Sequence, residues 1–231
     1  MFLRFSIARR CAALRVAAPM VALAVASLSG EPGVGRIVGR VRLVAADAGR
    51  PLTVSYTGRS ITQPGQPGPE IRNVVVYVQG LTGAPAAVRQ YEMRQQGETF
   101  VPRVLAIGRG STVTFPNADP YFHNVFSLSR AATFDLGRYP PGHSRLRTFT
   151  AAGLVKVFCH LHSHMSGSIL VFDHPWFTLP ADDGGFVIEG VPAGKQTLTA
   201  WHERIGEART TVTVPPGGEA SAEFVLPVVE P

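Results

Sequence analysis

The sequence predicts an all-β protein, and three observations support this fold class. Hydrophobic residues come in short runs that are rich in β-branched and aromatic side chains. Gly and Pro, with 24 and 19 of the 231 residues, separate these runs as turn residues do. Several runs alternate apolar and polar positions, as in Thr112-Val113-Thr114-Phe115. Strands with this spacing are typical of β-sandwiches and barrels.

The N-terminal segment, residues 1–26, has the pattern of a secretory signal. Residues 1–15 hold four arginines and no acidic residue, and residues 16–28 form an apolar run broken only by Pro19. Ala24 and Ala26 are small residues at the two positions that a signal peptidase reads. The apolar run is too short to span a bilayer. We therefore expect a periplasmic or otherwise exported protein without a transmembrane span once the signal is removed.

Removal of the signal changes both the charge and the cysteine count. The full chain has a formal charge of +6, but without the four arginines 18 basic residues face 16 acidic ones, about +2. The remaining basic residues are scattered, which argues against a nucleic-acid partner. Cys11 leaves with the signal, so Cys159 is the single cysteine and cannot form an internal disulfide. Such an exported thiol is expected to be buried, paired between chains or bound to a metal.

The strands are expected at twelve places along the chain after the signal. These are residues 36–44, 73–79, 103–107, 112–115, 124–128, 144–150, 155–159, 168–172, 185–189, 196–202, 208–214 and 220–226. Residues 84–96 are the only candidate for a helix. Residues 60–70, with three prolines and two glycines, are expected to form an irregular loop.

A cluster of soft metal ligands carries the chemistry of the sequence. Cys159, His162 and Met165 follow one another at intervals of three. They would diverge along an extended strand, so they need a tight loop between two strands, with His123 arriving from a distant strand. Two histidines, one cysteine and a weak axial methionine form the blue-copper ligand set.

Two further histidines leave the ligand set open at this point. His160 and His164 could replace His162 as ligands, and a His-x-His-x-His run can also bind zinc or nickel. They could instead lie at the rim of the site, solvated or gating electron entry. His143 and His174 are expected to be ordinary loop histidines.

Residues 110–117, residues 123–125 and the Cys159-x2-His162-x2-Met165 motif together resemble the cupredoxins, with a ligand loop similar to the amicyanin type. Residues 100–172 resemble plastocyanin-like periplasmic proteins often labelled methylamine utilization proteins, whose Phe-Asp-Leu-Gly run is matched by residues 134–137. The resemblance implies a Greek-key β-sandwich over residues 90–173. It also implies one type 1 copper ion held by His123, Cys159, His162 and Met165, and a role for Asn124 in bracing the ligand loop.

The C-terminal part of the chain looks like a carboxypeptidase regulatory-like, transthyretin-type β-sandwich. Asp183-Gly184-Gly185-Phe186 resembles its turn into a strand, and residues 192–194 resemble its Pro-x-Gly turn. The opening strands of such a sandwich are missing just before residue 181, but similar ones occur within residues 36–82. We therefore expect residues 36–82 and 176–228 to form one sandwich, with the cupredoxin sandwich inserted in it or adjacent to it. Within it, the Trp201-His202-Glu203 run is expected to place Trp201 in the core; the alternative is a contact patch for a ligand or partner.

These observations favour a copper protein that carries one electron at a time rather than an enzyme. The predicted ligand set leaves no open coordination position, and no acid–base constellation converges on it. The expected partner is a periplasmic redox protein whose identity the sequence does not give. A copper storage or delivery protein and a structural β protein with a vestigial metal site are the alternatives.

Overall fold

The computed structural model describes residues 33–45 and 70–228, and they form an all-β structure, as predicted. The one helical element in these ranges is a single 3-10 turn, η1 (Glu70–Asn73). Among the same residues, no helical segment has the length and hydropathy that a membrane crossing requires. The predicted signal, residues 1–26, and most of the predicted irregular loop at 60–70 lie outside the described residues.

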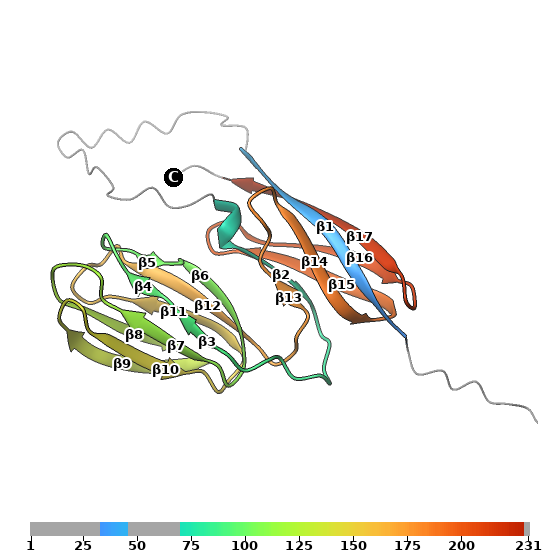
Figure 1. Ribbon diagram of the computed structural model, residues 1–231. Helices are drawn as coiled ribbons and strands as arrows, with labels where there is room; N and C mark the ends of the chain where they lie inside the picture. The colour runs from blue at the N-terminus through green and yellow to red at the C-terminus, as the bar shows by residue number, and fades with distance from the viewer. Residues whose placement is uncertain (1–32, 46–69, 229–231) are drawn as a thin grey trace, which may run out of the picture. The chain divides into compact units, whose positions relative to one another are not determined.

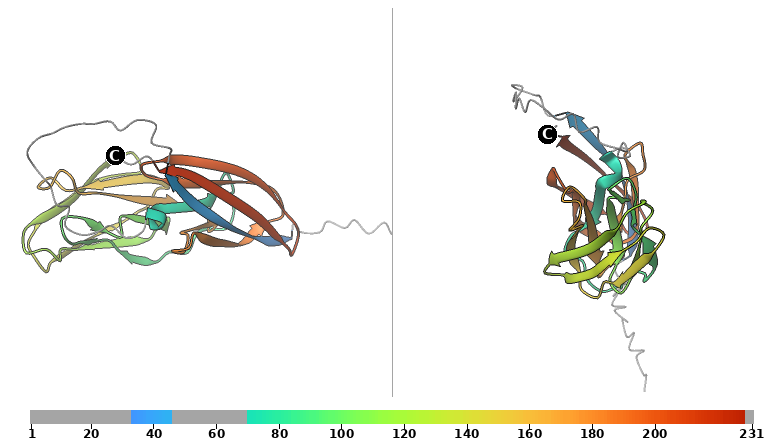
Figure 2. Two further views of the ribbon diagram at one scale, coloured as in Figure 1. Left: turned by 90° about the horizontal axis from the view of Figure 1, so that it is seen from above. Right: turned by 90° about the vertical axis from the view of Figure 1, so that its left-hand side faces the viewer.

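Seven strands form one two-layered β-sandwich, called here the outer sandwich (Figures 1 and 2). Its three-stranded sheet has the order β14 (Gly185–Pro192), β1 (Val34–Ala45), β17 (Glu219–Val228). Its four-stranded sheet has the order β13 (Phe177–Thr178), β2 (Val74–Val78), β15 (Gly194–His202), β16 (Gly206–Val214). Buried side chains from both sheets form one core between them, including Ile37, Val76, Phe186, Leu198 and Phe224.

Strands from the two ends of the described chain share the sheets of the outer sandwich. β1 runs antiparallel to β14 and parallel to β17. β2 runs antiparallel to β13 and β15. Residues before position 79 are thereby hydrogen-bonded to residues after position 176, and the segment between them forms a separate set of sheets.

The intervening segment forms a second sandwich, called here the inner sandwich. Its five-stranded sheet has the order β6 (Val104–Gly108), β12 (Ser166–Phe172), β11 (Gly153–Phe158), β8 (His123–Ser129), β9 (Ala132–Tyr139). A three-stranded sheet has the order β10 (Ser144–Thr148), β7 (Thr112–Pro116), β3 (Gln90–Glu92), and β4 (Arg94–Gln95) pairs with β5 (Phe100–Val101).

Alternation along the strands explains the core of the inner sandwich. In β7 the side chains of Val113 and Phe115 are buried, while the flanking threonines are partly exposed. In β11 Val155 and Val157 are buried in the same way. Because successive side chains point to opposite faces of a sheet, these positions line one face and pack together. Cys159 belongs to this core cluster.

The predicted helix at residues 84–96 is wrong, because this segment contains β3 and β4. Tyr91 pairs with Val113 in the parallel β3–β7 ladder, and the amide of Met93 donates to the carbonyl of Thr114. The side chain of Met93 is fully buried, whereas Val88 is 67% exposed. Pairing with a sheet edge thus outweighs the weak helical preference of the segment.

Strand β9 was missed because it carries little hydrophobic signal. It lies at the edge of the five-stranded sheet, and most of its side chains are partly or fully exposed. Gly137, with φ of 70°, interrupts it further. An edge strand with one face in solvent needs few apolar residues, so its sequence resembles a loop.

Trp201 is buried, as expected, and it packs with side chains of both sandwiches. Its cluster includes Val75 of the outer sandwich and Val104, Ala106 and Leu170 of the inner one. Glu203 accepts from the side chains of Arg103 and Ser168, while Lys156 lies 3.5 Å away. The Trp201-His202-Glu203 run is therefore packed in the structure rather than displayed on its surface.

Candidate metal centre

A short loop joins β11 to β12 and carries three of the four predicted ligands. Cys159 is the first residue after β11, and Met165 is the last residue before β12. The two strands pair antiparallel up to the Phe158–Ser166 pair, so the loop closes tightly. Within it, the amide of Met165 donates a 2.9 Å hydrogen bond to the carbonyl of His162. The turn removes the divergence that the same spacing would have in an extended strand.

The fourth predicted ligand, His123, arrives from a different strand of the same sheet. It is the first residue of β8, and its side chain is fully buried. β8 lies beside β11 through the Phe126–Phe158 pair. The sheet therefore fixes where His123 stands relative to Cys159, which is 36 residues away in the sequence.

Three donor atoms converge at this point. The Nδ1 atom of His123 lies 3.7 Å from the Sγ atom of Cys159, the Nδ1 atom of His162 lies 3.8 Å from it, and the two nitrogens are 3.1 Å apart. A trigonal ion with bonds of about 2.0 Å to nitrogen and about 2.3 Å to sulfur would separate its donors by roughly 3.5 to 3.7 Å. In the described part of the chain these three residues form the one cluster of His, Cys, Asp or Glu able to hold a metal ion.

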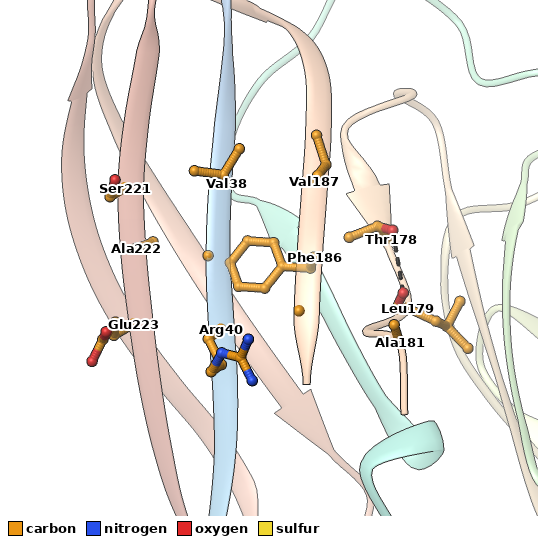
Figure 3. A pocket seen from close by; sticks show the side chains of 12 residues that line it. Val38, Arg40, Thr178, Leu179, Ala181, Phe186, Val187, Ser221, Ala222 and Glu223 are labelled. Carbon is orange, nitrogen blue, oxygen red and sulfur yellow. Dashed lines mark hydrogen bonds between the residues drawn. The ribbon is translucent and has the colours of Figure 1, made fainter. Parts of the chain in front are cut away.

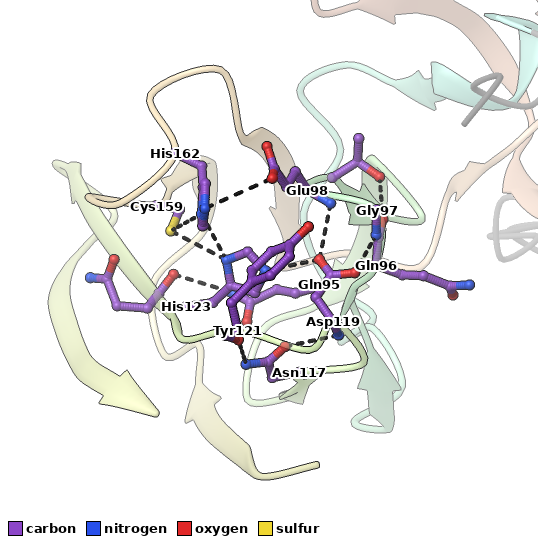
Figure 4. A network of polar contacts seen from close by, with 12 residues as sticks. Gln95, Gln96, Gly97, Glu98, Asn117, Asp119, Tyr121, His123, Cys159 and His162 are labelled. Atoms are coloured by element: carbon purple, nitrogen blue, oxygen red, sulfur yellow. Dashed lines mark hydrogen bonds and ion pairs between the residues drawn. The ribbon is translucent and has the colours of Figure 1, made fainter. Parts of the chain in front are cut away.

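Asp119 determines which nitrogen of His123 faces the thiol (Figure 4). Its Oδ2 atom lies 2.8 Å from the Nε2 atom of His123. Burial raises the pKa of Asp119, but hydrogen bonds from the amides of Glu98 and Gly97 and from His123 outweigh it and hold the pKa below its ordinary value. An ionised carboxylate only accepts hydrogen bonds, so Nε2 donates to Asp119 and Nδ1 is the ring nitrogen on the side of Cys159.

His162 lies at the solvent side of the cluster, with 21% of its side chain exposed. Its Nε2 atom is 4.0 Å from the carboxylate of Glu98, and its ring centroid is 5.4 Å from that of Tyr121. Burial and the nearby His123 lower the pKa of His162, while Glu98 opposes them. A lowered pKa favours the neutral imidazole, which is the form that binds metals.

Met165 and Cys159 are both buried in the core cluster of the inner sandwich. Cys159 is the free cysteine of the described residues. The amide of Met165 is fixed by the carbonyl of His162, which keeps its backbone in the same turn. The side chains of Met165 and Cys159 are therefore both shielded from water.

Asn124 connects β8 to the ligand loop. Its Oδ1 atom accepts a 2.7 Å hydrogen bond from the amide of His160, and its Nδ2 atom donates to Asp135 at 3.2 Å. Its backbone carbonyl accepts from the side chain of Gln95 at 3.0 Å. Because His160 directly follows Cys159, this hydrogen bond links β8 to the ligand loop next to the thiol. A bracing role for Asn124 requires such a contact.

The side chains of His160 and His164 make contacts outside the cluster of three donors. His160 stacks on Phe126 with a centroid distance of 3.8 Å and is 51% exposed. His164 is 61% exposed and lies 3.1 Å from the carboxylate of Glu98. The structure therefore brings together the set with His162 and leaves these two histidines outside it.

The two remaining histidines of the loops differ from each other. His143 is exposed, and its Nδ1 atom lies 3.1 Å from the carbonyl of Pro141. His174 is buried between the rings of Phe172 and Trp176, and burial lowers its pKa. The expectation of an ordinary loop histidine fits His143, whereas His174 is a packed part of the connection between β12 and β13.

Apart from Asn124, the groups that support the donors were not predicted from the sequence. Asp119 stands four residues before His123, but a lone aspartate before a proline gives no sign of its partner. Gln95 lies in the segment predicted to be helical, residues 84–96, and Glu98 follows two residues after its end. Their place beside the site depends on the β4–β5 hairpin, for which a Gly-Glu turn at residues 97–98 is an uncommon signal.

A shallow hollow elsewhere in the molecule carries none of this chemistry. It lies over β1, β14 and β17, where Val38, Val187, Arg40 and Glu223 line it (Figure 3). Its lining includes no histidine, cysteine or methionine. The converging donors around Cys159 are therefore the better candidate for a functional site.

Comparisons with known proteins match part of the chain to copper proteins. No protein-family model matches the sequence, and no curated protein matches it. Among solved structures, a Cu-containing nitrite reductase from Thermus scotoductus SA-01 is 26% identical, with 40% of this chain and 23% of that one covered and a TM-score of 0.34. A novel purple cupredoxin from Nitrosopumilus maritimus is 22% identical, with 36% and 99% covered and a TM-score of 0.33. A mutant of amicyanin in its Cu(I) form is 20% identical, with 42% and 98% covered and a TM-score of 0.34.

Each of these similarities covers less than half of this chain. The first of them covers about a quarter of the nitrite reductase.

Proposed function

We propose that this protein is an exported type 1 copper protein that acts as a periplasmic one-electron carrier. The observation that carries the proposal is the convergence of two imidazole nitrogens and one thiol sulfur within 3.8 Å of one another. Thiolate and imidazole are the ligands that blue-copper sites combine in a trigonal arrangement. The proposed ligands are His123, Cys159 and His162, with Met165 as the weak axial partner.

Copper would supply a centre that takes up and releases one electron by alternating between Cu(II) and Cu(I). The chain would contribute rigidity, because each donor is held by the fold. The sheet fixes His123, and the β11–β12 pairing fixes both ends of the ligand loop. Asn124 accepts a hydrogen bond from the amide of His160, the second residue of this loop. A pocket that keeps its geometry in both oxidation states lowers the reorganisation that each electron transfer requires.

We further propose that the inner sandwich, about residues 90–173, is a cupredoxin domain inserted in a carboxypeptidase regulatory-like sandwich. The pairing of β1 with β14 and β17, and of β2 with β13 and β15, supports this nested organisation. The signal-like residues 1–26 support export. The partly exposed edge of His162 is where an electron from a redox partner would enter.

A copper storage or delivery protein is the second candidate. The exposed His160 and His164 favour it, because they lie on the ligand loop and are free of the three donors. This function requires more than one Cu(I) ion for each chain and rapid release of the metal to an acceptor.

Metal analysis combined with redox titration separates these functions. We expect protein exported in copper-replete medium to hold one copper ion for each chain, to retain it against a mild chelator and to cycle reversibly in single-electron steps. A double variant, His160→Ala with His164→Ala, should keep this stoichiometry. Several rapidly exchanging Cu(I) ions would favour storage, and bound zinc or no metal at all would contradict both copper functions.

A further inference from the structure

The turn between β4 and β5 is linked through Asp119 to His123, the proposed copper ligand at the start of β8. Gln96 and Thr99 exchange backbone hydrogen bonds, so Gly97 and Glu98 form a two-residue hairpin turn. Both central residues have positive φ, 62° for Gly97 and 54° for Glu98. This is the backbone of a primed turn, and a glutamate in that conformation is uncommon.

The conformation of this turn aims two backbone amides at one carboxylate. The amide of Gly97 donates to Oδ1 of Asp119 at 2.6 Å, and the amide of Glu98 donates to Oδ2 at 2.9 Å. The amide of Asp119 itself donates to the side chain of Asn117 at 3.0 Å. The carboxylate is 7% exposed, so these bonds fix its orientation with little competition from water.

The remaining hydrogen bond of this carboxylate goes to a proposed copper ligand. Oδ2 of Asp119 accepts the Nε2 proton of the fully buried His123 at 2.8 Å. A carboxylate in this position increases the basicity of the opposite nitrogen, which is the Nδ1 atom facing Cys159. Cu(II) gains more from a basic nitrogen donor than Cu(I) does, because it carries the larger charge.

We propose that Asp119 is a positioning residue of the copper site, which orients His123 and lowers the reduction potential of the bound copper. The turn at residues 97–98 fixes the orientation of the Asp119 carboxylate. The carboxylate holds the imidazole proton of His123 on Nε2, which leaves Nδ1 free for the metal. This inference rests on the proposed copper function and specifies how its potential is set.

Asp119→Ala tests the inference in the full exported protein. We expect its affinity for Cu(II) to fall by about 10- to 100-fold, with a smaller loss for Cu(I), so the reduction potential rises. Asp119→Asn retains one acceptor oxygen and should show a smaller shift in the same direction. The asparagine variant also tests the role of Asp119 if Asp119→Ala does not fold, because asparagine has nearly the same shape as aspartate.

The copper-free protein offers a readout that does not depend on the metal. Nitrogen-15 NMR of the wild type should show His123 protonated at Nε2, and this single tautomer should be lost in Asp119→Ala. Glu70→Ala is the matched control, because Glu70 faces another buried histidine, His202, at 3.1 Å. It should change neither the copper affinity nor the potential.

The outcomes separate the inference from the copper function. A folded Asp119→Ala or Asp119→Asn protein with wild-type affinity, potential and His123 tautomer would overturn the role of Asp119. A wild type that binds no copper would overturn the copper function, and the NMR result would then still show whether Asp119 fixes the tautomer of His123.

Discussion

His123 and His202 are both fully buried histidines whose Nε2 atom faces a carboxylate, yet only one of them helps to form a candidate metal site. His123 faces Asp119 at 2.8 Å, and His202 faces Glu70 at 3.1 Å. The difference lies at the other ring nitrogen. Nδ1 of His202 accepts hydrogen bonds from the amides of Arg204 and Ile205, at 3.3 and 3.4 Å.

Nδ1 of His123 has no such backbone donor among the described residues, and it faces the thiol of Cys159 and the imidazole of His162. A buried imidazole whose two nitrogens are both satisfied by the protein is a structural group. One whose second nitrogen faces other soft donors is arranged for an additional atom. Burial and a carboxylate partner are therefore not sufficient to identify a histidine as a metal ligand. What distinguishes His123 from His202 is the group that its Nδ1 atom faces.

The largest expected effect comes from exchanging the two histidines for alanine. In the copper-loaded protein, His123→Ala should abolish the visible thiolate-to-copper absorption band, because the trigonal donor set loses one of its two nitrogens. His202→Ala should keep the thiolate-to-copper band but lower the free energy of unfolding by about 1–3 kcal/mol, because it leaves the amides of Arg204 and Ile205 without their acceptor and removes one of the donors to Glu70. Copper titration and chemical denaturation measure the two effects. Loss of the thiolate-to-copper band in a folded His202→Ala protein would contradict a purely structural role for His202.

Asn124→Ala should give the next largest effect. The variant removes the acceptor for the amide of His160 and the donor to Asp135, so the ligand loop loses its bond to β8. We expect about 10-fold weaker Cu(II) binding and a loss of about 1–2 kcal/mol of stability. Competition titration with a chelator and denaturation check the two values; wild-type behaviour in both would show that the β11–β12 pairing alone holds the loop.

A smaller effect should appear in the pH dependence of stability. Burial raises the pKa of Glu70, but hydrogen bonds from Asn73 and His202 and the charge of Arg204 outweigh it, so the pKa lies below its unfolded value of 4.5. The ionised form therefore stabilises the fold above about pH 4.5, and this contribution is lost as the pH falls through the folded pKa. The stability difference between wild type and Glu70→Gln should shrink over that range. A difference that stays constant on acidification would contradict the lowered pKa.

The smallest effect is expected for His160→Ala. Its ring stacks on Phe126 and is not part of the donor cluster, so the visible spectrum and the copper stoichiometry should remain those of the wild type. A changed spectrum would show that His160 is a ligand, in disagreement with the donor set of the structure.

Much of the metal site could be predicted because its signal is local. Cys159, His162 and Met165 stand at fixed intervals between two recognisable strands, so the need for a tight loop follows from strand geometry alone. The choice of His162 over His160 and His164 could not be derived in this way. It depends on the stacking of His160 on Phe126 and on the attraction of His164 to Glu98, both of which arise from residues distant in the sequence.

The strands that were predicted and the strands that were missed also differ in whether their signal is local. Strands with an apolar face, such as β7 and β11, were found at nearly their observed bounds. The edge strand β9 and the short strands β3 and β4 were missed because their pairing partners, not their own composition, determine their conformation. This error also hid the turn at residues 97–98, which supports Asp119.

The absorption spectrum of the copper-loaded protein tests the central claim most directly. We predict that one equivalent of Cu(II) gives an intense visible thiolate-to-copper band in the wild type. The band should be absent from Cys159→Ser, whose far-ultraviolet circular dichroism should show an intact β fold. A wild type that binds Cu(II) without this band, or a Cys159→Ser variant that retains it, would contradict the assignment of Cys159 as a copper ligand.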